Sequence, residues 1–379
     1  METNPAKILG QRISRLRKNL NLTQKDLAIH LDVGSPQIIS QIERGEREVK
    51  AWELAKLSKA LFVDVSDLLA TEEQAVEQPV LWRVLPLSEQ AIKEARFLKR
   101  CKEYAALEDL SGTARRRQFP QKEVDPHTVS FRDAARVADV IRAEFALGAR
   151  PAASLEKTLE DQFGVKIWYE NLDEGSAAAT IGDFGPAILM NRAEAPWRRN
   201  YNFAHELFHL ITWNSVPARQ LQEDQTLWES IEKVANCFAS CLLLPGDSVR
   251  VEIEERAVNE QLEDTDLIEI ARKFDVSTEA LLFRLLNLRL VSKETVDLIL
   301  SDEDFRSLDR STMSASWWEP PTVPERFVRL AFVAYQKGRL SRARLAHLLE
   351  TTLPDVTETL LKYGLDDRES YKKIDLRAA

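Results

Sequence analysis

The sequence lacks the features that would place the protein in a membrane or outside the cell. None of its apolar runs is long enough to cross a bilayer. The N-terminal segment is polar and has no signal-peptide core, so we expect no export. Its three cysteines are too few, and odd in number, for a disulfide framework. We therefore expect a reducing, cytoplasmic location.

The chain as a whole has no excess of positive charge, and a small local excess lies at the N-terminus. The formal net charge is −9, which argues against nonspecific nucleic-acid binding by the whole protein. Residues 1–70 hold 11 Lys and Arg against 9 Asp and Glu, a net charge of +2, which leaves −11 for the remainder. Six basic residues fall within the first 25: Lys7, Arg12, Arg15, Arg17, Lys18 and Lys25. A locally basic module on an acidic body is typical of a small DNA-binding domain joined to another domain.

The patterning predicts a multidomain, mostly α protein with a small α+β part. The predicted segments are short helices (1–70), a helical linker acting as a spacer (71–130), alternating helices and strands (131–254), a second helix-turn-helix-like stretch (255–302) and a helical C-terminal region (303–379). Thr23 and Ser35 are expected N-caps, and Val33–Gly34 the turn between their helices. Within the third segment we expect helices at 131–145 and 153–163 and strands at 165–169, 177–181 and 187–191. A polar stretch (71–78), a basic linker (113–127) and a Pro- and Trp-marked break (314–325) punctuate the chain.

The motif with the clearest chemistry is His205-Glu206-Leu-Phe-His209, an H-E-x-x-H pattern. On a helix, residues four apart share a face, so both imidazoles can reach one metal ion. Glu206 is displaced by about 100° around the axis, which suits a general base better than a ligand. Zinc with two histidines and one acid keeps an open position for water.

A third ligand is expected from the helix that follows. Glu232 shares a helical face with small residues that would let the two helices approach closely, and Asn236 on that face could orient a ligand histidine. Glu229, one turn earlier, is the alternative ligand. Cys237 and Cys241 point away from Glu232 and are expected to be core thiols.

Two further features of the site stay open at this point. Tyr201, Arg198 and Arg199 are near the motif in sequence, but nothing assigns any of them to the oxyanion. The predicted strand at 187–191 could present its edge to an extended substrate, which would bind through backbone hydrogen bonds.

The stretch AILMNRAEAPWRRNYNFAHELFHLI, followed by EKVANCFASCLLLP, resembles the ImmA/IrrE family of metallopeptidases. The resemblance covers roughly residues 131–290 and implies an α+β, zincin-like (gluzincin-type) domain with a short sheet. It also implies that His205, His209 and Glu232 bind zinc and that Glu206 is the catalytic base. Leu244 stands where many members have Met, a conservative departure. The C-terminal segment VPERFVRLAFVAYQKGRLSRARLAHLL is similar to members fused to a helix-turn-helix domain.

The stretch ISRLRKNLNLTQKDLAIHLDVGSPQIISQIERGERE resembles the XRE (lambda-repressor-like) helix-turn-helix. In that geometry the third helix faces base edges in the major groove. The expected base contacts are Ser35, Gln37, Ser40 and Gln41, and the expected phosphate contacts are Gln24, Arg44 and Arg47. Use of this module for dimerisation or partner docking is the alternative, and Arg15 and Arg17 also fit an ordinary solvated helix face.

Together the resemblances imply a zinc-dependent regulatory endopeptidase that cleaves a transcriptional repressor or antitoxin and binds operator DNA. The alternatives are a DNA-binding regulator or antitoxin whose metal site is structural or sensory, and a protease whose N-terminal domain recruits a protein. The ligand set favours Zn²⁺ and leaves Mn²⁺ open. The C-terminal region has no readable chemistry; dimerisation is one role for it, which would make the protein a homodimer.

Overall fold

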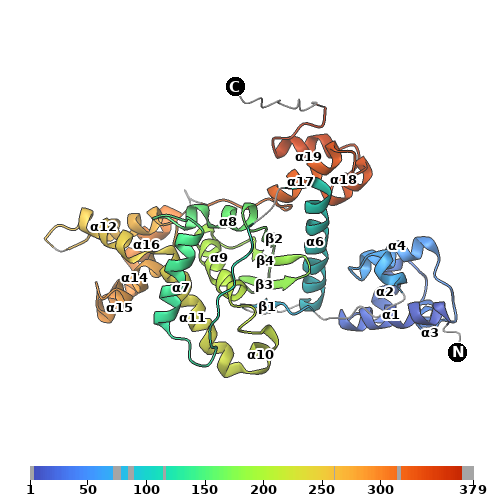
Figure 1. The fold of residues 1–379 in the computed structure, drawn as a ribbon, viewed down its shortest axis with the longest axis horizontal. Coiled ribbons are helices and arrows are strands. Elements are labelled where there is room, and N and C mark those ends of the chain that lie inside the picture. The colour runs from blue at the N-terminus through green and yellow to red at the C-terminus, as the bar shows by residue number, and fades with distance from the viewer. Residues whose placement is uncertain are drawn as a thin grey trace. The chain divides into compact units, whose positions relative to one another are not determined.

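The chain folds into two compact units in the computed structural model (Figure 1). The first unit comprises residues 1–78 and 85–103, and the second comprises residues 79–84 and 104–379. The structure describes residues 4–70, 78–83, 89–113, 117–259, 261–313 and 317–368. Most of the expected polar stretch, part of the basic linker and the start of the Trp-marked break lie outside the described residues.

The first unit is built from short capped helices. These are α1 (Pro5–Asn19), α2 (Gln24–Leu31), α3 (Pro36–Arg44), α4 (Ala51–Ala60), α5 (Val65–Leu69) and the first part of α6 (Gln90–Ser111). Thr23 caps α2 in a reciprocal capping box with Asp26, and Ser35 caps α3. The left-handed residue between these helices is Asp32, with φ 57°, and not Gly34. The turn therefore forms slightly earlier than expected.

Helices α1 and α3 pack closely at Gly10. A Cβ atom on this residue would lie 2.2 Å from the carbonyl oxygen of Ile42. The core beside this contact contains Ile13, Leu27 and Ile39, all fully buried. Glycine is therefore required at position 10 by the close approach of the α3 backbone.

Two of the N-terminal arginines belong to the interior of this unit and not to a solvated face. Arg17 is 8% exposed, and its Nε donates to Glu43 Oε1 over 2.6 Å. Arg12 is 9% exposed and donates to the carbonyl of Leu68 over 2.7 Å. The alternative of a solvated face is wrong for Arg17, because Glu43 on α3 provides a buried carboxylate for its guanidinium. Both arginines hold the helices together, so the surface of this unit is less basic than its sequence.

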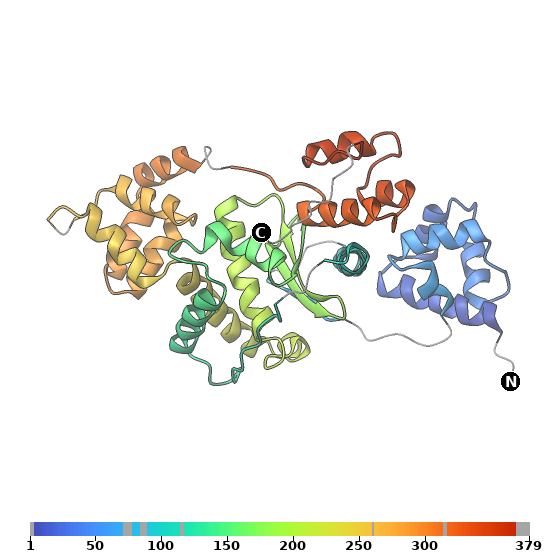
Figure 2. The same cartoon turned by 45° about the horizontal axis from the view of Figure 1, so that its top comes forward.

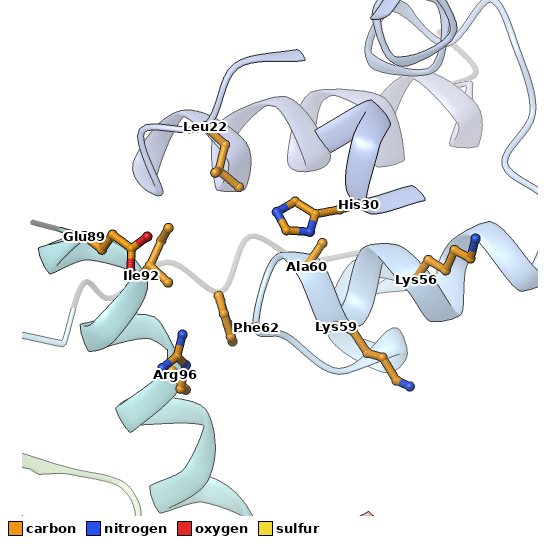
Figure 3. A pocket seen from close by; sticks show the side chains of 9 residues that line it. All are labelled: Leu22, His30, Lys56, Lys59, Ala60, Phe62, Glu89, Ile92 and Arg96. Carbon is orange, nitrogen blue, oxygen red and sulfur yellow. The ribbon is translucent and has the colours of Figure 1, made fainter. Parts of the chain in front are cut away.

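The N-terminal part of α6 packs on the helix-turn-helix and leaves a small pocket there of about 350 Å³ (Figure 3). His30, Phe62 and Ile92 line it, with the guanidinium of Arg96 5.6 Å from the Phe62 ring centre. This contact makes the start of α6 part of the first unit.

The second unit is organised around a four-stranded sheet. Its strands are β1 (Leu81–Trp82), β2 (Lys166–Glu170), β3 (Ala177–Gly182) and β4 (Gly185–Asn191), in the order β1-β3-β4-β2. β4 pairs antiparallel with β3 and parallel with β2, so it is an interior strand. The expectation that residues 187–191 offer an edge to substrate is therefore wrong, because both sides of β4 are already hydrogen-bonded.

The region expected to be only a spacer contributes to this sheet. β1 pairs antiparallel with β3, with Leu81 opposite Ala179. The C-terminal part of α6 packs near β2, where Tyr104 contacts the Trp168 ring at 6.1 Å between centres. Glu108 on this helix forms an ion pair with Lys166 on β2 over 3.2 Å.

Helices cover the sheet and carry the functional motif (Figure 2). The helices that follow α6 are α7 (Phe131–Glu144), α8 (Ala152–Asp161), α9 (Pro196–Ile211), α10 (Ala218–Glu223) and α11 (Gln225–Leu243). α9 packs on β3 and β4, while α11 packs on both α7 and α9. The expected helices and strands of this region are confirmed to within a few residues.

The remaining elements of the second unit are all helical. They are α12 (Gly246–Arg256), α13 (Asp264–Lys273), α14 (Thr278–Asn287), α15 (Lys293–Ser301), α16 (Glu303–Met313), α17 (Glu325–Gln336), α18 (Arg342–Leu348) and α19 (Val356–Lys362). α13 to α16 pack together beside α11, and α17 to α19 form a second group. In the described part of the chain, no helix is both long and apolar enough to cross a membrane.

Candidate metal centre and nucleic-acid interface

Helix α9 presents the H-E-x-x-H residues to the interior. It begins at Pro196, a favoured residue for a first helical position, and is buried over most of its length because it lies between the sheet and α11. His205 is 0% exposed, Glu206 1% and His209 4%. The apolar residues around the motif thus place three ionisable side chains in the core.

Helix α11 brings the third side chain to the same point. Asp224 caps this helix, and Ala235 and Ala239 are fully buried where it packs on α9. Glu232 lies on α11 with 16% of its side chain exposed. The small alanines allow the close approach that this pairing requires.

Three side chains converge with their acceptor atoms facing one another. Glu232 Oε1 is 3.0 Å from His209 Nε2, and Glu232 Oε2 is 3.2 Å from His205 Nε2. The two imidazole Nε2 atoms are 3.2 Å apart. One potential ligand atom from each residue lies within 4.8 Å of the others, a grouping suited to a metal ion. Glu229, the alternative ligand, is exposed and hydrogen-bonded to Gln225, outside this group.

Asn236 determines which nitrogen of His205 faces this group. Its Oδ1 atom lies 3.1 Å from His205 Nδ1 and accepts a hydrogen bond from Arg83 Nη2 over 3.4 Å. Because a guanidinium can only donate, the Asn236 atom between them must be the acceptor oxygen. His205 Nδ1 then carries the proton, and its Nε2 lone pair is free to face His209 and Glu232.

Burial makes this arrangement unfavourable for charge without a cation. Burial lowers the pKa of His205 to about 4. Burial alone would also lower the pKa of His209, but the adjoining Glu232 carboxylate outweighs it and raises that pKa. Burial acts to raise the pKa of Glu232, and its contacts with both imidazoles hold the pKa well below its ordinary value. Two imidazoles and a carboxylate that face one another in the core fit a divalent cation.

Glu206 stands beside this group without a partner. Both of its carboxylate oxygens are buried and accept no hydrogen bond from the residues that the structure describes. Burial raises the pKa of Glu206 to about 7. A buried carboxyl group without hydrogen bonds is costly for stability, and such groups concentrate at functional sites.

Arg83 contacts residues beside the metal centre, and the sequence analysis missed it. It follows β1 and donates to both Asn202 and Asn236, and its guanidinium lies 5.7 Å from the Tyr201 ring centre. No local motif marks it, because its partners are 119 and 153 residues away in the chain.

The three residues considered as stabilisers of the oxyanion differ in their burial and hydrogen bonds. Arg199 is 1% exposed and donates to backbone carbonyls, including that of Trp318 over 2.7 Å, so it holds the structure together. Tyr201 donates its hydroxyl to the backbone oxygen of Asn236 over 2.8 Å, and burial raises its pKa to about 12. Arg198 is exposed.

The two cysteines of α11 are not equivalent. Cys241 is 4% exposed and accepts a hydrogen bond from Arg284 Nη1 over 3.0 Å. Cys237 is only half-buried, so the expectation of a core thiol is wrong for this residue. The hydrogen bond from Cys237 and the adjacent Arg284 lower the pKa of Cys241 to about 7.

The residues expected to contact DNA are only partly available. Gln37, Gln41 and Arg44 are exposed on α3, while Ser35 and Ser40 are half-buried. All three expected phosphate contacts already have a carboxylate partner within the protein. Arg44 forms an ion pair with Glu46 over 2.9 Å, and both side chains are exposed. Gln24 donates to Glu43 over 2.8 Å, and Arg47 makes a two-pronged ion pair with the buried Glu53, at 2.7 and 3.1 Å.

Two segments of the chain match known families. Residues 160–286 match the peptidase family described as IrrE N-terminal-like domain, and residues 13–68 match the family described as Helix-turn-helix. Both resemblances drawn from the motifs are confirmed, with the helix-turn-helix ahead of the peptidase-like domain in the chain. The mostly helical multidomain fold with a small sheet is confirmed as well. The motif on α9 and Glu232 both lie inside the first match.

Solved structures give weaker likenesses. A Mycobacterium tuberculosis transcriptional regulator is 19% identical, over 49% of this chain and 51% of its own, with a TM-score of 0.31. This chain thus spans about half the length of that protein. PlcR from Bacillus thuringiensis, in complex with a peptide and DNA, is 12% identical over 94% of this chain and 96% of its own, with a TM-score of 0.16. A comparison with curated proteins finds no match.

Proposed function

We propose that this protein is a zinc-dependent endopeptidase that controls gene expression and carries its own DNA-binding domain. The observation that carries the proposal is the convergence of His205, His209 and Glu232 beside an unpartnered Glu206. The match of residues 160–286 to a peptidase family supports it. The substrate would be a transcriptional repressor or antitoxin, and the site of action the cytoplasm, where operator DNA is found.

His205, His209 and Glu232 would hold the ion. This set of two imidazoles and one carboxylate favours zinc over manganese, which prefers oxygen ligands. Bound there, zinc would supply Lewis acidity toward a peptide carbonyl and toward the attacking water. Asn236 keeps the proton on His205 Nδ1, so that the Nε2 atom stays available as a ligand.

Glu206 would move the proton. Its carboxylate neighbours both histidines on α9 and is not held by any hydrogen bond. It can therefore accept a proton from the attacking water and deliver it to the departing amine. Replacement by Gln removes this basicity and keeps the size of the side chain.

Helix α3 would read the operator. Gln37 and Gln41 are exposed on it, and glutamine can form paired hydrogen bonds with adenine in the major groove. Arg44 is the exposed cation at the end of the same helix. We assign Gln24 and Arg47 a weaker part, because each is held by a buried or nearly buried carboxylate, whereas the partner of Arg44 is the exposed Glu46.

The test uses the full chain and its Glu206→Gln variant. Metal is quantified in both, and each is incubated with candidate repressors encoded beside the gene. We expect zinc in both proteins and cleavage by the wild type alone. Zinc binding combined with equal cleavage by both variants would reject Glu206 as the base.

The burial of the centre favours a second candidate, a DNA-binding regulator whose metal site is structural or sensory. His205 and Glu206 are almost completely buried, as in a site that need not admit a polypeptide. On this alternative, zinc removal by a chelator changes DNA affinity, and no repressor is cleaved under any condition. Operator binding that persists in Gln37→Ala with unchanged sequence preference would contradict the role given to α3.

A further inference from the structure

The second unit contains a large cavity next to the metal centre but separate from it. Its volume is about 1170 Å³, enough for a ligand larger than those in typical pockets of about 300–1,000 Å³. Asn236 and Tyr201 lie in its wall, whereas none of the three converging side chains, nor Glu206, lines it. The four side chains of the metal centre therefore lie outside the lining of this cavity.

Cations dominate the lining of this cavity. They come from the segment after β1, from helices α7, α9, α11 and α14, and from the residues after α14: Arg83, Arg132, Arg198, Lys233, Arg284 and Arg289. Two carboxylates share the wall, Glu194 and Glu279. The Glu194 carboxylate already accepts hydrogen bonds from Ser176 and Asn202.

No carboxylate among the described residues forms an ion pair with these cations, and Arg284 instead donates a hydrogen bond to Cys241 Sγ. Arginines elsewhere in this unit, such as Arg326 and Arg272, do form ion pairs. The protein as a whole carries a net charge of −9, so carboxylates are abundant and yet do not neutralise this wall. Like charges gathered in a concave wall raise the local concentration of an anion.

Aromatic side chains supply the second part of the site. Phe131 is 59% exposed and Phe283 45% exposed, and both lie in the cavity wall. Exposed large apolar side chains beside cations suit a ligand with an anionic end and a flat ring. Guanidinium groups, which make up five of the six cations, match the paired oxygens of a phosphate.

We propose that this cavity binds a nucleotide, with its phosphates held by the unpaired cations and its base placed against the exposed aromatic rings. The proposal does not depend on proteolysis. Arg83 and Asn236 stand in the cavity wall and also contact each other, and Asn236 contacts His205. A ligand that binds Arg83 would therefore change the contacts of Asn236, which orients His205.

The test measures binding of ADP to the zinc-loaded full chain by calorimetry, with inorganic pyrophosphate and adenosine as separate probes. Arg198 and Lys233 are exposed, and neither side chain forms a hydrogen bond or ion pair with a described residue, so their replacement by Gln should leave the fold intact. The matched control replaces Arg136 and Arg329, which are 75% and 50% exposed outside the cavity, and so removes the same charge.

We expect ADP to bind saturably and more tightly than either probe alone. Arg198→Gln/Lys233→Gln should weaken ADP binding by at least about tenfold, since each charged hydrogen bond to phosphate is strong, and Arg136→Gln/Arg329→Gln should not. If ADP acted instead by removing zinc from the protein, its effect would be the same in both double variants. The proposal is overturned if ADP does not bind saturably, if both double variants lose affinity equally, or if an oligoglutamate peptide binds more tightly than ADP.

Discussion

Asn236→Ala should weaken zinc binding without removing a ligand. In the wild type, Asn236 Oδ1 accepts from His205 Nδ1 and from Arg83, so the amide both orients the imidazole and separates it from a cation. In the variant, His205 loses the acceptor that holds its proton on Nδ1, and the Arg83 charge is no longer screened from the centre. Loss of such an orienting partner typically costs about 10- to 100-fold in metal affinity, or about 1.4–2.7 kcal/mol.

The cavity next to Asn236 decides where in that range the effect falls. Because Asn236 lines this cavity, water can enter the space left by the truncation and accept the proton of His205 Nδ1. Water cannot offset the nearby Arg83 charge as a fixed amide oxygen does. We therefore expect a loss near the middle of the range. Asn236→Asp should bind zinc at least as tightly as the wild type, because a carboxylate accepts the same proton and neutralises Arg83.

The assay is competition for zinc between the full chain and a chromophoric chelator at constant pH. Glu229→Gln is the matched control, since Glu229 lies on the same helix, is exposed and accepts a hydrogen bond from Gln225 away from the metal centre. Thermal melting of each variant without metal establishes that the fold is retained. Zinc affinity in Asn236→Ala within twofold of the wild type would refute the orienting role.

Three further results are expected. Gly10→Ala should destabilise the first unit by at least about 2 kcal/mol, because the new Cβ meets a backbone carbonyl oxygen at 2.2 Å. Gly34→Ala is the control, since a Cβ there has open space. An unchanged melting curve for Gly10→Ala would contradict the close packing of α1 on α3. Burial raises the pKa of Glu160 to about 8, so folding favours its protonated form: the unfolding free energy should fall as pH rises from about 5 to 8, and Glu160→Gln should flatten this slope. The rate of Cys241 alkylation should rise with pH around a midpoint near its pKa of about 7, as measured by mass spectrometry at several pH values. Arg284→Gln should move this midpoint upward, because Arg284 donates a hydrogen bond to the sulfur. An unchanged midpoint would show that Arg284 does not stabilise the thiolate.

The local part of the site could be predicted because its geometry follows from helical spacing. His205 and His209 are four residues apart, and Glu232 and Asn236 are four apart on the next helix, so each pair shares a face. The choice of Glu232 over Glu229 followed from the same periodicity, and only Glu232 reaches the histidines.

What the sequence analysis missed depends on contacts between distant segments. The order of strands in a sheet is not written in the pattern of any single strand, so the interior place of β4 could not be read from it. A solvated face stayed open as an alternative for Arg17 because helical spacing does not reveal that Glu43 on another helix approaches it. Arg83 follows a strand of only two residues, too short to give a periodic signal.

The two-residue strand β1 also bears on how the protein can be divided. Residues 79–84 belong to the second unit, while the residues on either side of them belong to the first. A cut placed after residue 84 would remove β1 from the edge of β3 and would remove Arg83 from beside Asn236. Any recombination that exchanges the helix-turn-helix for another reader must therefore join ahead of Pro79. The helix-turn-helix is interchangeable only if the short segment that follows it, residues 79–84, stays joined to the rest of the second unit.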